Sequence, residues 1–227
     1  VQTCALPISD AAHQLRTPLA GLRLHVDRAR GSSDPAVIRD ALQHIEQLTQ
    51  RTARTSTQLL ALTRAQSPWK ERATAGDVDL AKLVPKAVEL RIPEALRAKV
   101  DLGYQGPDHP AMIHGDAAAL QELLDNLIDN ILRYAGEGAS ATVSVLPLPD
   151  QGVLLQVEDS GPGVPPEALE RLGERFFRVA GTQASGTGLG LAIVQQIAQQ
   201  HGARLGFGAA AGGGLRIGLQ FPPAPKS

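Results

Sequence analysis

Apolar residues recur at helical spacing in the first part of the chain. Within residues 9–30 they share one helical face, at Leu15, Leu19, Leu22 and Val26. Pro18 interrupts this stretch, and we expect the helix to bend there. Residues 31–35 then predict a stop and a restart. Asp34 is the expected N-cap of a second helix, and Pro35 is its expected first residue.

The second helix keeps a seven-residue repeat to about Ala65. Its two seam positions are Ile38, Ile45, Thr52 and Leu59, and Ala41, Leu48, Thr55 and Leu62. A hairpin about Ser33 would place residue 13 level with the neighbourhood of Ala53, beside two threonine layers. Two helices cannot bury this seam alone, so the pattern favours a homodimeric four-helix bundle. On periodicity alone, a structural coiled coil is the simpler interpretation.

The rest of the chain mixes helical and strand periodicities. A polar stretch at 67–77, with Pro68 and Gly76, predicts a linker. Beyond it, three segments have helical spacing and three alternate like strands: 81–98, 117–134 and 189–201, then 141–146, 152–158 and 215–221. This order predicts an α/β sandwich with helices on one face of a mixed sheet. The expected division is a hairpin at 9–66, a second domain at 78–222 and a disordered tail at 223–227.

Composition limits the classes of partner. The 22 basic and 23 acidic residues give a net charge of -1, which offers no electrostatic reason to bind nucleic acid or an anionic membrane. No apolar run approaches the roughly 20 residues that cross a bilayer, and no signal peptide is visible. We therefore expect a soluble segment without membrane contact. The single cysteine, Cys4, fits a reducing cytoplasm.

Residues 1–8 are predicted to be foreign to the protein. Their sequence, Val-Gln-Thr-Cys-Ala-Leu-Pro-Ile, is encoded by GTT CAG ACG TGT GCT CTT CCG ATC, which resembles the end of a common sequencing-library primer. We exclude this segment from the fold prediction and expect that upstream parts of the protein are missing.

A glycine-rich block opens the predicted helix at 189–201. It contains Gly186, Thr187, Gly188, Leu189 and Gly190. No Gly-x-x-x-x-Gly-Lys-Ser/Thr run is present and no strand precedes this block, which excludes a P-loop and a dinucleotide fingerprint. Glycines at a helix start let backbone N–H groups approach phosphate oxygens. Taken alone, the block is more typical of a flexible loop.

Two further blocks carry polar side chains. Four of them lie on one side of the helix predicted at 117–134: Asn126, Asn130, Arg133 and Tyr134. An amide oxygen there suits Mg²⁺, which prefers hard oxygen ligands. For Asn126 we favour a structural hydrogen bond within the helix packing. The other block, Asp159-Ser160-Gly161-Pro162-Gly163, ends a strand, and a tight turn is its simplest interpretation.

The run His13-Gln14-Leu15-Arg16-Thr17-Pro18-Leu19 precedes these blocks. The order and spacing of the blocks resemble the catalytic core of a sensor histidine kinase from about Ser9 to Pro222, with 174–178 as its F box. The first run is similar to that of tricarboxylate-responsive sensor kinases. The resemblance implies a dimerisation and phosphoacceptor hairpin followed by a GHKL-type α/β sandwich that binds ATP.

The resemblance also implies the chemistry and the partners. ATP and Mg²⁺ are the implied cofactors, and His13 would take the γ-phosphoryl group and pass it to an aspartate of a response regulator's receiver domain. The full-length protein would be anchored in a bacterial inner membrane, with this segment in the cytoplasm. The implied metal ligand is Asn130. The implied phosphate contacts are Arg133, Arg178 and the 186–190 block. The implied adenine contacts are Tyr134 and Asp159, the latter with Gly161 and Gly163.

One residue departs from the family pattern. Gln14 stands where most relatives have Glu or Asp, and it can orient a ring nitrogen but cannot take a proton. A second hypothesis is therefore a non-catalytic scaffold that binds ATP and a receiver. Thr17 matches the position that orients water for receiver dephosphorylation, although a residue preceding a proline kink is the plainer interpretation. A GHKL ATPase or chaperone is disfavoured by the His13 run and by the end of the ATP domain near residue 222.

Several residues were assigned no chemistry. Phe176 and Phe177 are expected to pack, and Arg175 to be an exposed charge. The remaining histidines match no metal-ligand spacing and are interpreted as surface or incidental residues: His25, His44, His109, His114 and His201.

Overall fold

A computed structural model describes the backbone of residues 6–65, 75–149, 151–179 and 186–224, with side chains described from Pro18 onwards except at scattered positions between 51 and 75. The chain divides into two compact units, 1–63 and 64–227. Among the described helices, none combines the length and apolarity needed to span a bilayer.

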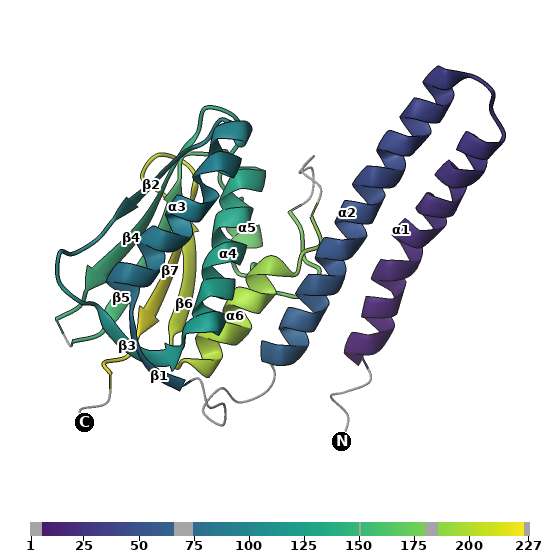
Figure 1. Ribbon diagram of the computed structural model, residues 1–227. Coiled ribbons are helices and arrows are strands. Elements are labelled where there is room, and N and C mark those ends of the chain that lie inside the picture. Colours follow the sequence, from purple (N-terminus) through teal and green to yellow (C-terminus); the bar gives the residue numbers. More distant parts are fainter. Residues whose placement is uncertain (1–5, 66–74, 150, 180–185, 225–227) are drawn as a thin grey trace. The chain divides into compact units, whose positions relative to one another are not determined.

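The first unit is a hairpin of two helices, α1 (Leu6–Arg30) and α2 (Pro35–Ala65) (Figure 1). The predicted restart between them is confirmed. The Asp34 side chain accepts a hydrogen bond from the N–H of Ala36 at 2.8 Å, and Pro35 is the first residue of α2. Helix α1 begins three residues before the expected Ser9 and continues through Pro18 as one helix.

Three cross-helix contacts define the register of the hairpin. Gly21 lies against Leu48, the rings of His25 and His44 stack at 4.7 Å, and Arg28 pairs with Asp40 at 3.2 Å. All three pairs are symmetric about a point near Asp34. Continued along both helices, this register places the backbone of His13 level with Ser56, about one turn beyond the expected Ala53.

The hairpin buries only part of its apolar surface. Ala41 of the predicted seam is fully buried, whereas Leu19 and Val26 of the predicted α1 face are 54% and 39% exposed. Leu24 and Leu42 are also exposed. Thr52 is half-buried, and its hydroxyl donates to the Leu48 carbonyl at 2.7 Å, so this polar layer is satisfied within α2.

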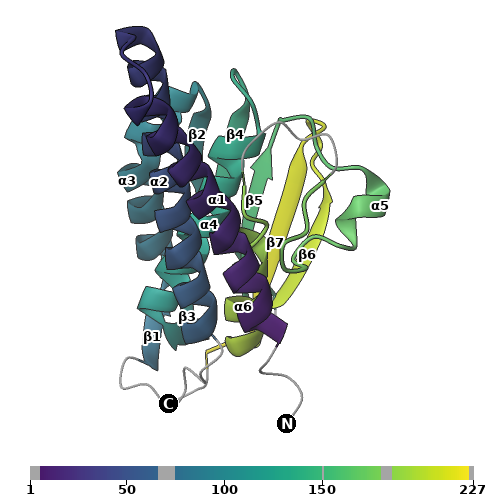
Figure 2. The same ribbon diagram turned by 90° about the vertical axis from the view of Figure 1, so that its right-hand side faces the viewer.

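The second unit is built on a five-stranded mixed sheet of order β2-β4-β5-β7-β6, in which only β2 and β4 are parallel. Its strands are β2 (Asp101–Gln105), β4 (Ser140–Pro147), β5 (Val153–Asp159), β6 (Arg204–Ala209) and β7 (Leu215–Phe221). Three helices cover one face of the sheet: α3 (Leu80–Ala98), α4 (Ala117–Tyr134) and α6 (Gly190–Gln200) (Figures 1 and 2). The predicted α/β sandwich with a mixed sheet is confirmed.

Four short strands and one short helix were not predicted. The four strands are β2 and β6, already described, together with β1 (Ala75–Asp79) and β3 (Met112–Asp116). The short helix is α5 (Pro166–Leu169). Strands β1 and β3 form a separate antiparallel pair. Since β1 begins at Ala75, the last three residues of the predicted linker belong to a strand. Residues 66–74, and residues 225–227 of the predicted tail, lie outside the described residues.

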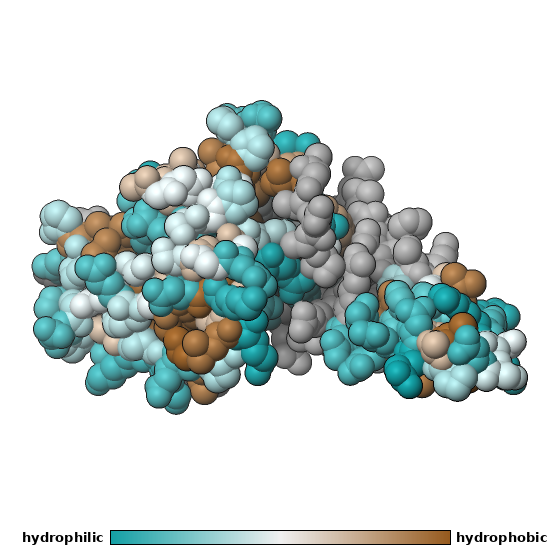
Figure 3. All heavy atoms as spheres, turned by 90° about the horizontal axis from the view of Figure 1, so that it is seen from above, coloured by the Kyte–Doolittle hydropathy of each residue, from teal (hydrophilic) through white to brown (hydrophobic). Residues whose placement is uncertain are grey.

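The core lies between the sheet and the helices. Helix α4 contributes half of the largest fully buried side chains in the described core, including Leu123, Leu127 and Ile128, which are at most 1% exposed. On the outside of this unit, Leu90 and Leu96 of α3 are 65% and 71% exposed. Figure 3 shows that apolar side chains on the face seen there form separate patches within a mostly polar surface.

The interpretation of His201 as a surface residue was wrong, because it is 4% exposed. Its Nδ1 lies 2.8 Å from the Ile197 carbonyl, to which it donates, and its Nε2 accepts from the N–H of Asp116 at 3.1 Å. The ring also packs against Gly115 and edge-on to Phe221. His201 therefore joins the end of α6 to the start of α4.

Candidate nucleotide site

Helix α4 carries the polar candidates beside its buried apolar face. Asp116 caps it by accepting from the N–H groups of Ala118 and Ala119 at 3.0 and 3.4 Å. The apolar face is buried against the sheet and the neighbouring helices. As predicted, the four polar candidates share one side of the helix, beside the apolar face, and all are half-buried: Asn126, Asn130, Arg133 and Tyr134.

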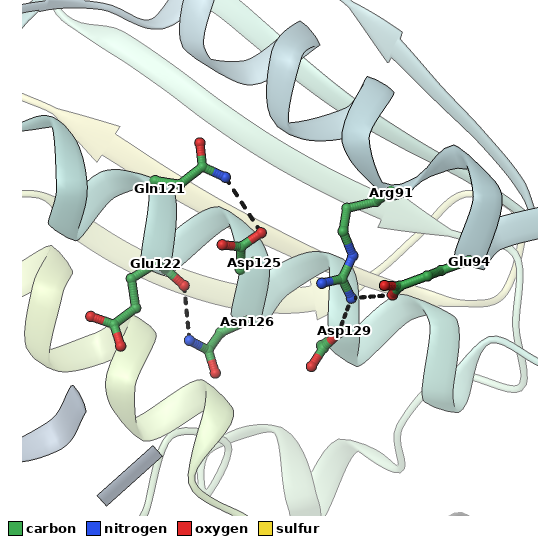
Figure 4. A network of polar contacts seen from close by, with 7 residues as sticks. All are labelled: Arg91, Glu94, Gln121, Glu122, Asp125, Asn126 and Asp129. Carbon is green, nitrogen blue, oxygen red and sulfur yellow. Dashed lines mark hydrogen bonds and ion pairs between the residues drawn. The ribbon is translucent and has the colours of Figure 1, made fainter. Parts of the chain in front are cut away.

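The two asparagines of α4 differ in their hydrogen bonds. Nδ2 of Asn126 donates to the Glu122 carbonyl at 2.8 Å (Figure 4), which is the structural bond favoured from the sequence. This bond fixes the amide and leaves its Oδ1 as an acceptor. Asn130 has no side-chain hydrogen bond within the described part of the chain, although it is half-buried. An amide in that condition is suited to an external partner, including a metal ion or its water.

Asp159 is held at the end of β5 by backbone donors. Its Oδ1 accepts from the N–H of Gly161 at 2.8 Å and of Leu215 at 3.4 Å. One carboxylate oxygen is thereby fixed, and the other remains an acceptor for a ligand. Gly161 is required here, because a Cβ would lie 2.7 Å from the backbone of Ala135.

The separate sequence blocks come together at the end of α4. Gly161, after Asp159, contacts Ala135, which follows α4 directly. Gly186, at the start of the glycine-rich block, packs against the hydroxyl oxygen of Tyr134. The structure therefore gathers the α4 residues, the Asp159 turn and the glycine-rich block at one place.

The F box is attached to the glycine-rich block by its backbone. The N–H of Phe176 donates to the Gly188 carbonyl at 2.9 Å. Both residues have positive φ, 65° for Phe176 and 71° for Gly188, and a Cβ on Gly188 would lie 2.6 Å from the Phe176 backbone. Only glycine fits at 188 without displacement of this segment.

The remaining candidates around these blocks have different environments. Leu189 is completely buried, so it can offer a nucleotide only its backbone, and Thr187 accepts from the Leu189 N–H at 3.3 Å. Phe177 is half-buried under the Arg171 guanidinium at 4.2 Å, as expected for a packing residue. Arg178 is exposed, and the rest of the expected lid, 180–185, lies outside the described residues.

The phosphoacceptor candidates His13, Gln14 and Thr17 lie within α1. Their side chains are outside the described part of the structure.

Sequence reasoning missed an ion-pair cluster that borders this site. Arg91 of α3 reaches Asp129 of α4 and also contacts Glu94 at 2.9 Å (Figure 4). One turn earlier, Asp125 accepts from Gln121 at 3.4 Å. Burial raises the pKa of Asp125, with the Gln121 hydrogen bond and Arg91 opposing that shift. The available signal was Asp129, a charged residue next to Asn130.

Two family models match this chain. Residues 8–68 match the His Kinase A (phospho-acceptor) domain. Residues 115–225 match the family described as histidine kinase-, DNA gyrase B-, and HSP90-like ATPase.

Known proteins are similar over most of the chain. The sensor protein QseC of Salmonella typhi is 38% identical over 94% of this chain and 46% of its own length. The signal transduction histidine-protein kinase/phosphatase MprB of Mycolicibacterium paratuberculosis is 31% identical over 94% of this chain and 41% of its own length. This chain thus spans less than half the length of either relative.

A solved structure shares the fold. The histidine kinase ThkA in complex with the response regulator TrrA matches with a TM-score of 0.78 and 20% identity, over 97% of this chain and 62% of ThkA. At this identity the likeness concerns the fold alone.

Proposed function

The chain belongs to the sensor histidine kinases of two-component systems, and we propose that it transfers the γ-phosphoryl group of ATP to His13 and then to an aspartate of a response regulator. One observation carries the ATP-binding part of this proposal. The α4 residues, the Asp159 turn and the glycine-rich block contact one another through Ala135, Gly161, Tyr134 and Gly186.

The residues at this site fit an adenine nucleotide. The oxygen of Asp159 that makes no backbone hydrogen bond accepts from the adenine amino group, and a guanine carbonyl there would leave the acceptor unpaired. Tyr134 lies against the base. The backbone of 186–190, at the start of α6, faces the phosphates together with Arg133, and Arg178 reaches the γ-phosphate.

The amide of Asn130 also fits a metal ion, because it is half-buried and without a partner in the described part of the chain. When bound, Mg²⁺ would neutralise charge on the phosphates during transfer. Asn130 would hold the ion directly. The Asn126 oxygen, oriented by the bond to Glu122, would hold one of its waters.

The transfer forms a nitrogen–phosphorus bond at His13 as the bond between the γ-phosphorus and the β-phosphate oxygen breaks, and ADP leaves. The attacking nitrogen must be unprotonated. Gln14 orients the ring but cannot accept its proton, so that proton passes to water. In the second step the receiver aspartate attacks the phosphohistidine, and the imidazole leaves.

The partners follow from the hairpin and from the relatives. Leu19, Leu24 and Leu42 are more than half exposed, and a second copy that completes a four-helix bundle would cover them. The receiver domain is the second partner, and Thr17 supports its dephosphorylation, an activity that the name of MprB includes. In this proposal the full-length protein is anchored in a bacterial inner membrane, with this segment in the cytoplasm.

The test is to incubate the chain with γ-labelled ATP. We expect label in an acid-labile, alkali-stable bond. His13→Gln should abolish it with ATP affinity unchanged, and the matched control His109→Gln, at an exposed histidine, should keep it. ATP binding without label on the parent would favour the non-catalytic scaffold, and equal label on His13→Gln would refute the assignment.

A further inference from the structure

Arg91 makes a polar contact between α3 and α4 next to the proposed metal ligand. Its side chain is 18% exposed, and the guanidinium contacts the carboxylates of both Asp129 and Glu94 (Figure 4). Asp129 is 39% exposed. The Arg91 side of the pair is thus largely shielded from water, whereas Asp129 keeps contact with it. The two contacts restrict where the Arg91 guanidinium can lie.

Asp129 lies on the outward side of α4, away from the apolar face that packs in the core. In a helix of 3.6 residues per turn, position 129 is about 60° from Asn126 and about 100° from Asn130 around the axis. Its contact with Arg91 joins this side of α4 to α3. A rotation of α4 that moved either asparagine out of the site would therefore separate Asp129 from Arg91.

Apolar packing alone would define this rotation less sharply. The face that α4 buries consists of leucine, isoleucine and alanine, such as Leu124, Leu127 and Ile131. Leucine and isoleucine are similar in size and can repack at low cost. A directional contact between charged groups has fewer equivalent arrangements.

We propose that Arg91 and Asp129 are positioning residues, which hold α4 so that Asn126 and Asn130 face the metal–nucleotide complex. This inference rests on the proposed function. The pair acts through the two asparagines and touches no substrate itself.

The same cluster offers an alternative that experiment can separate. Arg91 faces three carboxylates, those of Glu94, Asp125 and Asp129, so the pair also alters the charge near an anionic ligand. If charge alone mattered, Asp129→Asn would strengthen ATP binding and Arg91→Gln would weaken it. Positioning predicts that both changes weaken it.

The experiment titrates the full chain with ATP in the presence of Mg²⁺ and with ADP in its absence. We expect Asp129→Asn and Arg91→Gln each to raise the Kd for Mg²⁺–ATP by about tenfold, the loss of one charged hydrogen bond. The Kd for metal-free ADP should change less than about threefold, since Asp159 is held by other elements. The exchange Arg91→Asp with Asp129→Arg should restore Mg²⁺–ATP binding to within about threefold.

A matched control lies just beyond the C-terminal ends of the same two helices. Lys99 pairs with Glu137 at 2.9 Å, with both side chains more than two-thirds exposed. Glu137→Gln should change neither affinity, because an exposed pair contributes little. Tighter ATP binding by Asp129→Asn, equal losses for both nucleotides, or no recovery in the exchange would each overturn the inference. A parent chain that binds neither nucleotide would instead refute the proposed function.

Discussion

Replacement of Asp159 by asparagine tests the adenine site most directly. In the structure Oδ1 of Asp159 accepts from the N–H groups of Gly161 and Leu215 at 2.8 and 3.4 Å. Asparagine has the same shape, and its amide oxygen can accept from both groups. Its NH₂ then takes the position of the second carboxylate oxygen. A donor therefore replaces the acceptor that faces the adenine amino group.

The expected loss has two parts. A hydrogen bond to a charged group contributes about 1.5–3 kcal/mol, and a buried donor left unpaired costs about 1–3 kcal/mol more. We take about 3–4 kcal/mol for the sum. Each 1.4 kcal/mol is a factor of ten, so the Kd for ATP should rise by roughly several hundredfold.

The assay is calorimetric titration with ATP and with inosine triphosphate, whose base has a carbonyl in place of the amino group. The new NH₂ can donate to that carbonyl, so inosine triphosphate should bind Asp159→Asn more tightly than it binds the parent. Both backbone bonds are kept, and the Tm should fall by less than about 4 °C. Asp101→Asn, at an exposed carboxylate, is the matched control. Unchanged ATP affinity, or a loss for ATP without a gain for inosine triphosphate, would refute the reasoning.

Three further predictions concern the metal, the missing acid and the core. Asn130→Ala should remove the Mg²⁺-dependent part of ATP affinity while metal-free ADP binds as before; an unchanged Mg²⁺ dependence in titrations would place the ion elsewhere. Gln14→Glu should autophosphorylate faster than the parent near pH 8, where imidazole with an ordinary pKa of about 6.5 is neutral; initial rates no faster there would show that the acid was never limiting. His201→Ala should destabilise the second unit by about 3 kcal/mol, because the Asp116 N–H loses its acceptor and a cavity forms. Thermal unfolding should therefore show a Tm lower by about 6–12 °C. The control His109→Ala, at an exposed histidine, should leave the Tm unchanged.

The long periodic elements could be predicted from the sequence because each buries one face continuously. Helix α4 and strand β7 have the predicted bounds, 117–134 and 215–221. The apolar residues recur at helical spacing throughout α4 and alternate with polar residues or glycine throughout β7. The local sequence pattern and the tertiary environment therefore favour the same structure.

The short strands could not be predicted, because their pairing partners define them. Strands β2 and β6 are the two edges of the sheet, and both contain glycine, which disfavours strands locally. In β1, Val78 is the only large apolar residue. Tertiary hydrogen bonds override these weak local signals.

The candidate site, too, could be predicted only in part. Its residues could be recognised from spacing, but the contacts that orient them could not. The Arg91–Asp129 pair and the His201–Asp116 bond each join residues far apart in the chain. Nothing in the local sequence around His201 distinguishes a buried histidine from an exposed one.

The contact between His201 and Gly115 has an evolutionary consequence. A Cβ at position 115 would lie 2.5 Å from the imidazole ring, so substitution of Gly115 is compatible only with a smaller side chain at 201. Loss of the histidine, in turn, leaves the amide of Asp116 in need of another acceptor. Positions 115 and 201 should therefore vary together among homologues, and lineages that lose the histidine should carry a compensating acceptor near the start of α4.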